Sequence, residues 1–77
     1  MSPSTLADTD VSKIYRITGF EDPSSAYADK LRGMGFTDGT SIEHVQGASH
    51  DPQVFFVRGS RVALRKSEAK WVFVEEL

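Results

Sequence analysis

The sequence predicts a mainly β domain, a small barrel or curled sheet of about five short strands with one short helix inserted after the first strand. Short stretches rich in β-branched and aromatic residues recur along the chain, and glycine, proline and aspartate separate them. Only one stretch, over residues 25–34, has apolar residues at helical spacing. Short strands linked this tightly typically close into a small barrel.

The length and composition restrict the class of protein. A chain of 77 residues makes one domain, and a domain this small buries only about 60% of the surface of its unfolded chain, which leaves little room for a deep cleft. The chain has no cysteine, which removes disulfides and thiolate metal sites and suits a reducing cytoplasm. It has no signal-peptide pattern and no apolar run near the roughly 20 residues that cross a bilayer. A net charge of −2 argues against a general nucleic-acid binder.

The N-terminal segment, residues 1–11, is rich in Ser, Thr, Asp and Pro and is expected to be a mobile tail. Leu6 is the apolar residue in it that is placed to anchor the tail. A single domain is expected over residues 12–77, and its first strand over residues 13–20.

One helix is expected from Ser24 or Ser25 to Met34. Tyr27, Leu31 and Met34 fall at i, i+4 and i+7 and form a single apolar stripe. The stripe predicts that one side of the helix packs on the sheet.

The helix is expected to stop at a glycine. Gly35 can take the left-handed conformation at little steric cost, and Phe36 then folds back onto the last helical turn. Asp38 and Gly39 are expected to make a tight turn into the next strand.

The remaining strands are expected over residues 40–46, 53–58, 61–65 and 71–75. In the first of them, Ile42 and Val45 break strict alternation, which predicts a bulge or an irregular end of the strand. Gly59 and Ser60 are expected to be the two-residue turn of a hairpin, of the kind that needs glycine first. A single helical turn is expected over residues 67–70.

Several short motifs follow one another at a characteristic spacing. They are Leu31-Arg32-Gly33-Met34-Gly35-Phe36, Gly39, Asp51-Pro52, Val62-Ala63-Leu64-Arg65, Glu68-Ala69 and Val72-Phe73-Val74. From about residue 6 to residue 74 the chain thereby resembles FeoA, the small cytoplasmic component of bacterial ferrous iron transport. The domain also resembles the C-terminal module of iron-dependent repressors.

The resemblance implies an SH3-like barrel that acts as an accessory or regulator of the membrane GTPase-permease FeoB, modulating transport or GTP turnover. It implies no catalysis, no cofactor and no direct membrane insertion. Two positions depart from the family pattern. Asp38 stands where proline is usual, and His50 stands where glycine is frequent. Both turns are expected to survive these changes.

Iron transport directs attention to metal ligands, for which the candidates are His44, His50, Asp51 and Met34. Two histidines and no cysteine are few of the nitrogen and sulfur ligands that a transition-metal site needs. His44 is in phase with Ile42 and is expected to be half-buried in the sheet. We therefore predict no metal site, and a metal-responsive role remains as an alternative.

Basic residues cluster late in the chain. They are Arg58, Arg61, Arg65, Lys66 and Lys70, and Phe55, Phe56 and Trp71 lie near them in sequence. This combination is typical of a small nucleic-acid-binding barrel. The net negative charge favours the interpretation that these basic residues form the solvated face of a hairpin. No nucleic-acid partner is therefore predicted.

Alternation along the strands and the helix predicts a core of Tyr27, Leu31, Phe55, Val57, Val62, Leu64, Val72 and Val74. It leaves four large apolar residues on the outside: Val54, Phe56, Trp71 and Phe73. We expect these four to form a partner-binding patch with Arg58, Arg61 and Arg65 at its rim. Coverage by the helix or the N-terminal tail is an equally good interpretation, and self-association through the patch also stays open.

Overall fold

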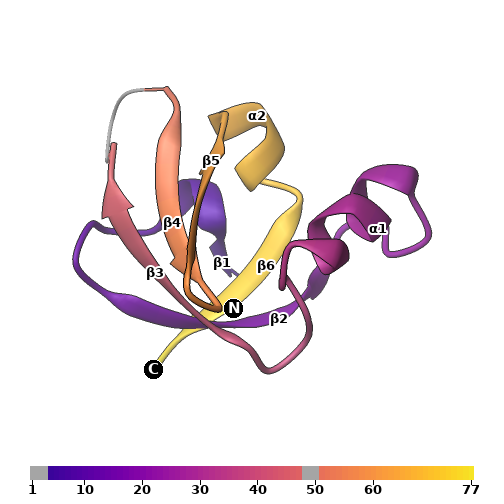
Figure 1. Ribbon diagram of the computed structural model, residues 1–77, viewed down its shortest axis with the longest axis horizontal. Helices are drawn as coiled ribbons and strands as arrows, with labels where there is room; N and C mark the ends of the chain where they lie inside the picture. Colours follow the sequence, from indigo (N-terminus) through magenta and orange to yellow (C-terminus); the bar gives the residue numbers. More distant parts are fainter. Residues whose placement is uncertain (1–3, 48–50) are drawn as a thin grey trace.

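The computed structural model describes residues 4–47 and 51–77. Its elements are β1 (Ser4–Thr5), the 3-10 turn η1 (Leu6–Asp8), β2 (Ile14–Phe20), α1 (Ala26–Gly33), β3 (Ser41–Gln46), β4 (Gln53–Val57), β5 (Ser60–Leu64), α2 (Lys66–Ala69) and β6 (Val72–Glu76). The described strands form one antiparallel sheet in the order β1-β6-β2-β3-β4-β5, which curls around the core (Figure 1). The predicted mainly β class is confirmed, with six strands instead of about five.

The N-terminal segment is part of the sheet from residue 4 onward. Ser4 pairs with Val74 and Thr5 with Phe73, which makes β1 an edge strand beside β6. Leu6 then turns into the core and is fully buried. This corrects the expected mobile tail over residues 1–11, of which residues 1–3 lie outside the described part, and it extends the expected domain of residues 12–77 toward the N-terminus. The expectation that Leu6 anchors the segment is confirmed.

The η1 turn links the two ends of the curled sheet. The side-chain amide of Gln53, on β4, donates to the carbonyl oxygen of Ala7 at 3.2 Å. Because β1 and β5 are the two edges of the sheet, this contact connects the first strands to the hairpin that ends at the other edge.

The core is made of the inward faces of the strands and one side of α1. Its buried apolar members are Leu6, Tyr15, Ile17, Phe20, Ala28, Leu31, Phe36, Ile42, Phe55, Val57, Val62, Leu64, Ala69, Val72 and Val74. Every predicted core residue is among them except Tyr27, which is half-buried and packs against the edge of the core.

The predicted start and stop signals of the helix are present, although α1 ends at Gly33, one residue before the expected Met34. The Ser25 hydroxyl accepts a hydrogen bond from the Ala28 amide and caps the first turn. At the other end Gly35 has a φ of +100°, and the Phe36 amide donates to the carbonyl oxygen of Leu31 at 3.0 Å. Phe36 is thereby placed in the core.

Met34 does not belong to the apolar stripe that the spacing predicts. The helix ends at Gly33, Met34 has left the helical conformation, and its side chain is 41% exposed. The stripe is therefore shorter than expected, with Leu31 as its buried member.

The β4–β5 hairpin turns one residue earlier than expected. Val57 pairs with Ser60, so the turn residues are Arg58 and Gly59, with φ of +48° and +82°. Two positive φ values are typical of the type I′ turn, whose twist suits a tight hairpin. The expected Gly59-Ser60 turn is corrected accordingly.

The turn brings Arg58 onto the loop that follows α1. A Cβ atom at Gly35 would lie 3.0 Å from Cδ of Arg58, so the arginine stem lies against the glycine backbone. The Arg58 guanidinium donates to the hydroxyl oxygens of Thr37 and Thr40 at 3.4 and 3.3 Å. The tip of the hairpin is thus held against the segment between α1 and β3.

The first prediction concerns the N-terminal segment. We expect Leu6→Ala to lower the free energy of unfolding by about 2–5 kcal/mol, because it leaves a cavity in the core of a domain whose total stability is about 5–15 kcal/mol. Urea denaturation followed by the fluorescence of Trp71 measures the change. Leu77→Ala is the control, since Leu77 is 58% exposed and its truncation should change stability by less than about 0.5 kcal/mol. Equal stabilities of the two variants would contradict a structural role for Leu6.

Candidate functional site

The outer face of the sheet carries a row of side chains that crosses four neighbouring strands. Glu43 pairs with Ile14 on one side and Phe56 on the other, and Phe56 pairs with Arg61. Neighbouring strands lie about 4.8 Å apart, so the row spans roughly 14 Å. Ile14 and Phe56 are 49% and 42% exposed and line one shallow hollow. This hollow, with its exposed apolar side chains, is the candidate interaction surface on the sheet face.

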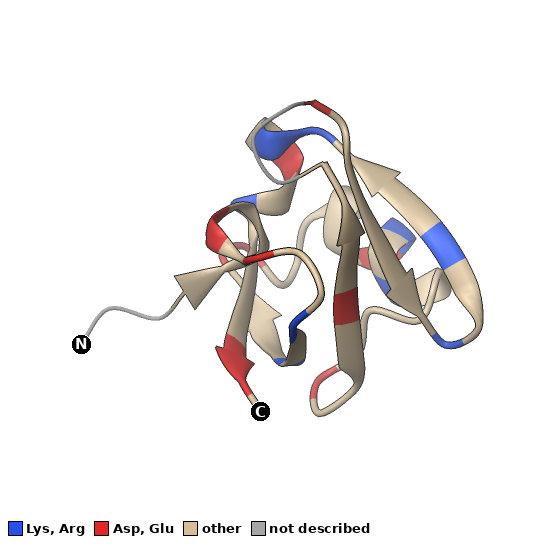
Figure 2. Cartoon of the chain, turned by 90° about the vertical axis from the view of Figure 1, so that its left-hand side faces the viewer, with Lys and Arg blue, Asp and Glu red and all other residues tan. Residues whose placement is uncertain are grey.

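This surface is called the sheet-face patch below and comprises Ile14, Val54, Phe56, Arg58 and Arg61. Val54 is half-buried on the same outer face of β4. Neither arginine forms an ion pair with the residues that the structure describes. Figure 2 shows basic residues on the β4–β5 hairpin and acidic residues at the C-terminal end of β6. The Arg61 side chain is exposed beside Phe56, whereas the Arg58 guanidinium is hydrogen-bonded to Thr37 and Thr40.

The structure does not bring Trp71 and Phe73 to the sheet-face patch. Trp71 immediately precedes β6 and Phe73 lies on it. In the sheet, β6 is separated from β4 by β2 and β3. Phe73 is half-buried and pairs with Thr5 on one side and Gly19 on the other. The N-terminal segment thus lies beside Phe73, as one interpretation of the sequence anticipated. Arg65 is exposed at the start of α2.

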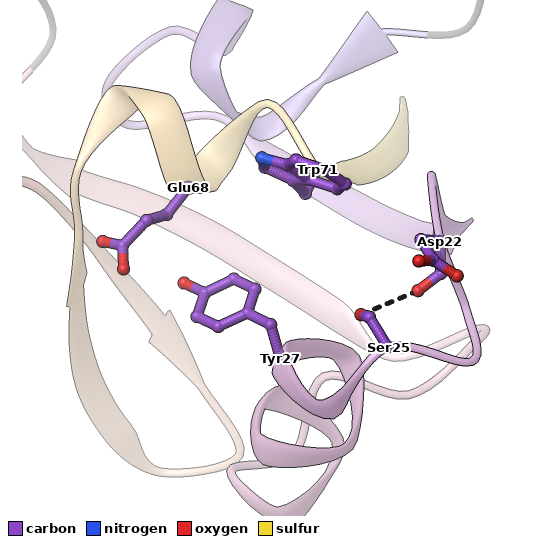
Figure 3. A pocket seen from close by; sticks show the side chains of 5 residues that line it. All are labelled: Asp22, Ser25, Tyr27, Glu68 and Trp71. Carbon is purple, nitrogen blue, oxygen red and sulfur yellow. Dashed lines mark hydrogen bonds between the residues drawn. The ribbon is translucent and has the colours of Figure 1, made fainter.

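A second surface lies between the start of α1 and the α2–β6 segment. It is a mostly apolar hollow of about 300 Å³ lined by Asp22, Ser25, Tyr27, Glu68 and Trp71, and it is called the helix groove below. In Figure 3 the rings of Tyr27 and Trp71 lie on opposite sides of the hollow, with the Glu68 carboxylate near the tyrosine hydroxyl and Asp22 at the other end beside Ser25. Trp71 is 39% exposed.

The environment of the Tyr27 hydroxyl is partly apolar and partly acidic. Its oxygen is buried and makes no hydrogen bond with the residues that the structure describes. Burial, as the larger cause, and the nearby Glu68 carboxylate together raise the pKa of Tyr27 to about 12. The Glu68 carboxylate is held in place because it accepts a hydrogen bond from the Arg65 amide at 2.9 Å.

His44 has a packing role. It is fully buried, which corrects the expectation of a half-buried ring. Its Nδ1 lies 2.9 Å from the Thr9 hydroxyl oxygen and its Nε2 lies 3.0 Å from the Gln46 carbonyl oxygen. The pairing register shifts between His44 and Gln46, as the sequence predicts for a bulge at Val45.

The other metal-ligand candidates do not converge with His44. Asp51 is exposed and accepts a hydrogen bond from the Lys66 amide at 2.8 Å, and His50 lies outside the described residues. Over residues 4–47 and 51–77 there is no group of three or more His, Cys, Asp or Glu side chains that could hold a metal ion.

Residues 4–76 match the family model described as the FeoA domain. The chain belongs to the FeoA family. Its members are associated with ferrous iron transport, so the resemblance seen in the sequence is confirmed. No helix in the described part of this FeoA-family chain has the length and apolar character needed to cross a membrane.

Solved structures of FeoA proteins share the fold. The chain is similar to Stenotrophomonas maltophilia FeoA complexed with zinc, an SH3 domain protein, at 30% identity and a TM-score of 0.86, covering 94% of this chain and 89% of that one. It is similar to iron(II) transport protein A from Clostridium thermocellum at 36% identity and a TM-score of 0.87, covering 96% of this chain and 46% of that one. The predicted SH3-like fold is confirmed. No curated protein sequence matches this one closely enough to count as a relative.

A manganese-dependent transcriptional repressor has the same fold at 11% identity, with a TM-score of 0.83 and coverage of 100% of this chain and 44% of the repressor. This similarity shows the fold alone. The sequence predicts a resemblance to the C-terminal module of iron-dependent repressors, and the match with this manganese-dependent repressor supports that resemblance at the level of the fold.

Two features of these surfaces were not predicted from the sequence, namely the outward position of Ile14 and the helix groove. Ile14 is out of phase with the inward Tyr15 and Ile17, and this alternation was a sufficient signal that it faces outward. The helix groove gave no local signal, because Tyr27 lies about forty positions before Glu68 and Trp71 in the chain.

The second prediction concerns Tyr27 and Glu68. We expect Glu68→Gln to lower the pKa of Tyr27 from about 12 toward the ordinary value of 10.0, because a neutral amide no longer opposes the phenolate. The folded-state pKa is raised, so the stabilisation from neutral Tyr27 is complete below pH 10 and is lost as the pH rises toward 12. An NMR titration of the tyrosine ring carbons measures the pKa. Glu43→Gln, on the sheet face, is the control and should leave the pKa of Tyr27 unchanged. An equal effect of both substitutions on this pKa would exclude a specific action of Glu68.

Proposed function

We propose that this chain is a non-enzymatic cytoplasmic accessory protein of ferrous iron uptake that binds the cytoplasmic parts of the membrane transporter FeoB and modulates transport or GTP turnover. The family supplies the link to ferrous iron transport. The observation that carries the binding role is the sheet-face patch, where Ile14 and Phe56 stay exposed on a small domain.

The exposure of these two side chains has a cost in stability. A domain of this size needs nearly all its apolar residues for its core, yet an isoleucine and a phenylalanine are exposed on the outer face of the sheet, on either side of Glu43. Burial against a partner gains about 25 cal/mol per Å² of apolar surface. Binding therefore explains the placement of Ile14 and Phe56 better than folding does.

The composition of the patch suits a protein partner. The exposed Phe56 ring lies between Glu43 on β3 and Arg61 on β5, and neither Arg58 nor Arg61 forms an ion pair in the described part of the chain. Interfaces are enriched in aromatic residues and arginine. Arg65 extends the basic rim toward α2, while Trp71 and Phe73 remain candidate contacts on a separate surface.

The arrangement supports binding more than reaction. His44 is buried with both ring nitrogens in hydrogen-bonding contact, so it cannot serve as a base for a substrate. The described residues contain no other histidine. The two surface hollows described above are lined by side chains typical of recognition.

The third prediction tests the partner and the patch together. Phe56→Glu should weaken binding to the purified cytoplasmic domains of FeoB by about 30-fold or more, the effect of losing a hot-spot residue worth about 2 kcal/mol. Isothermal titration calorimetry measures the affinity. Lys30→Glu, which places the same carboxylate on the exposed side of α1, is the control and should bind like the unchanged protein.

The outcomes separate the alternatives. Equal binding by Phe56→Glu and the unchanged protein would rule out the sheet-face patch. Absence of binding by the unchanged protein would rule out the partner. Binding of single-stranded RNA that weakens steeply with salt would favour a nucleic-acid-binding module, and concentration-dependent sedimentation abolished by Phe56→Glu would favour self-association.

A further inference from the structure

The helix groove has a shape and a chemistry that the sheet-face patch does not share. Its walls are the rings of Tyr27 and Trp71, and its volume of about 300 Å³ is at the lower limit of small-molecule sites. A single long side chain is therefore a better match to the groove than a cofactor-sized ligand.

The groove carries negative charge at both ends. The Glu68 carboxylate lies at one end and the Asp22 carboxylate at the other (Figure 3), and no lysine or arginine is among the lining residues. Neither carboxylate forms an ion pair with the described residues.

Both carboxylates are fixed by the fold. Glu68 accepts a hydrogen bond from the Arg65 amide at 2.9 Å. Asp22 accepts from the amide and the hydroxyl of Ser24 at 3.3 and 3.0 Å. Because they are held before any ligand arrives, they lose little conformational entropy on binding a cation.

We propose that the helix groove binds a lysine or arginine side chain, flanked by apolar residues, in a segment of a partner protein. The cationic head lies between the two carboxylates and over the face of Trp71, where a cation is attracted by the ring electrons. The apolar stem of the side chain and its apolar neighbours pack on Tyr27 and Trp71. This site is independent of the sheet-face patch and does not require that the partner be FeoB.

The fourth prediction uses Trp71, the single tryptophan of the chain, as a reporter inside the groove. The probe is the synthetic peptide acetyl-Gly-Leu-Arg-Leu-Gly-amide, and its matched control has glutamine in place of arginine. We expect a saturable change in tryptophan fluorescence with the arginine peptide and an affinity about tenfold lower for the glutamine peptide, since the cation–π contact and the ion pairs are lost. Equal affinities, or no saturable change with the arginine peptide, would overturn the proposal.

Two charge-removing variants locate the site. Glu68→Gln and Asp22→Asn keep the acceptor oxygen that each backbone hydrogen bond needs, so the fold should be retained, and thermal unfolding checks this. Each should lower the affinity for the arginine peptide about two- to fivefold, which is the range of exposed ion pairs. The affinity for the glutamine peptide should stay unchanged. Glu43→Gln removes one charge from the sheet face instead. An equal loss of affinity with Glu43→Gln would mean that overall charge attracts the peptide, and the groove would be excluded.

Discussion

The position of β6 between β1 and β2 is the constraint on which the rest of the structure depends. The last strand of the chain supplies Val72 and Val74 to the core and gives β1 its pairing partner. Because β1 is held there, Leu6 reaches the core. The same strand follows directly after α2, so its placement also sets Trp71 opposite Tyr27 and creates the helix groove.

The parts of the fold that depend on local chemistry could be predicted from the sequence. The inward and outward faces of the strands follow from alternation, and the end of α1 follows from Gly35 and Phe36. The edge strand β1 could not be predicted, since Ser4 and Thr5 have no apolar pattern and their partners lie about seventy positions later in the chain. The hairpin turn was misplaced by one residue because Arg58 adopts a conformation that the sequence alone assigns to glycine.

The candidate surfaces were predictable to a similar extent. Alternation correctly placed Phe56 on the outside, but the neighbours of Phe56 depend on strand order. That order puts β3 and β2 beside β4, so Ile14 joins Phe56 while Trp71 and Phe73 lie elsewhere. The described part of the chain thereby presents two surfaces of opposite character. One is apolar with basic residues beside it, and the other is aromatic with acidic ends.

The close contact between Arg58 and Gly35 makes the hairpin tip and the helix-terminal loop a single mechanical unit. The arginine stem lies on the glycine backbone and its guanidinium is bonded to Thr37 and Thr40. Displacing the hairpin therefore moves the loop or breaks these contacts, and the loop continues directly into α1, which forms one wall of the helix groove. These contacts depend on the absence of a Cβ atom at Gly35, so a side chain at this position would push the hairpin tip away from the loop that ends α1.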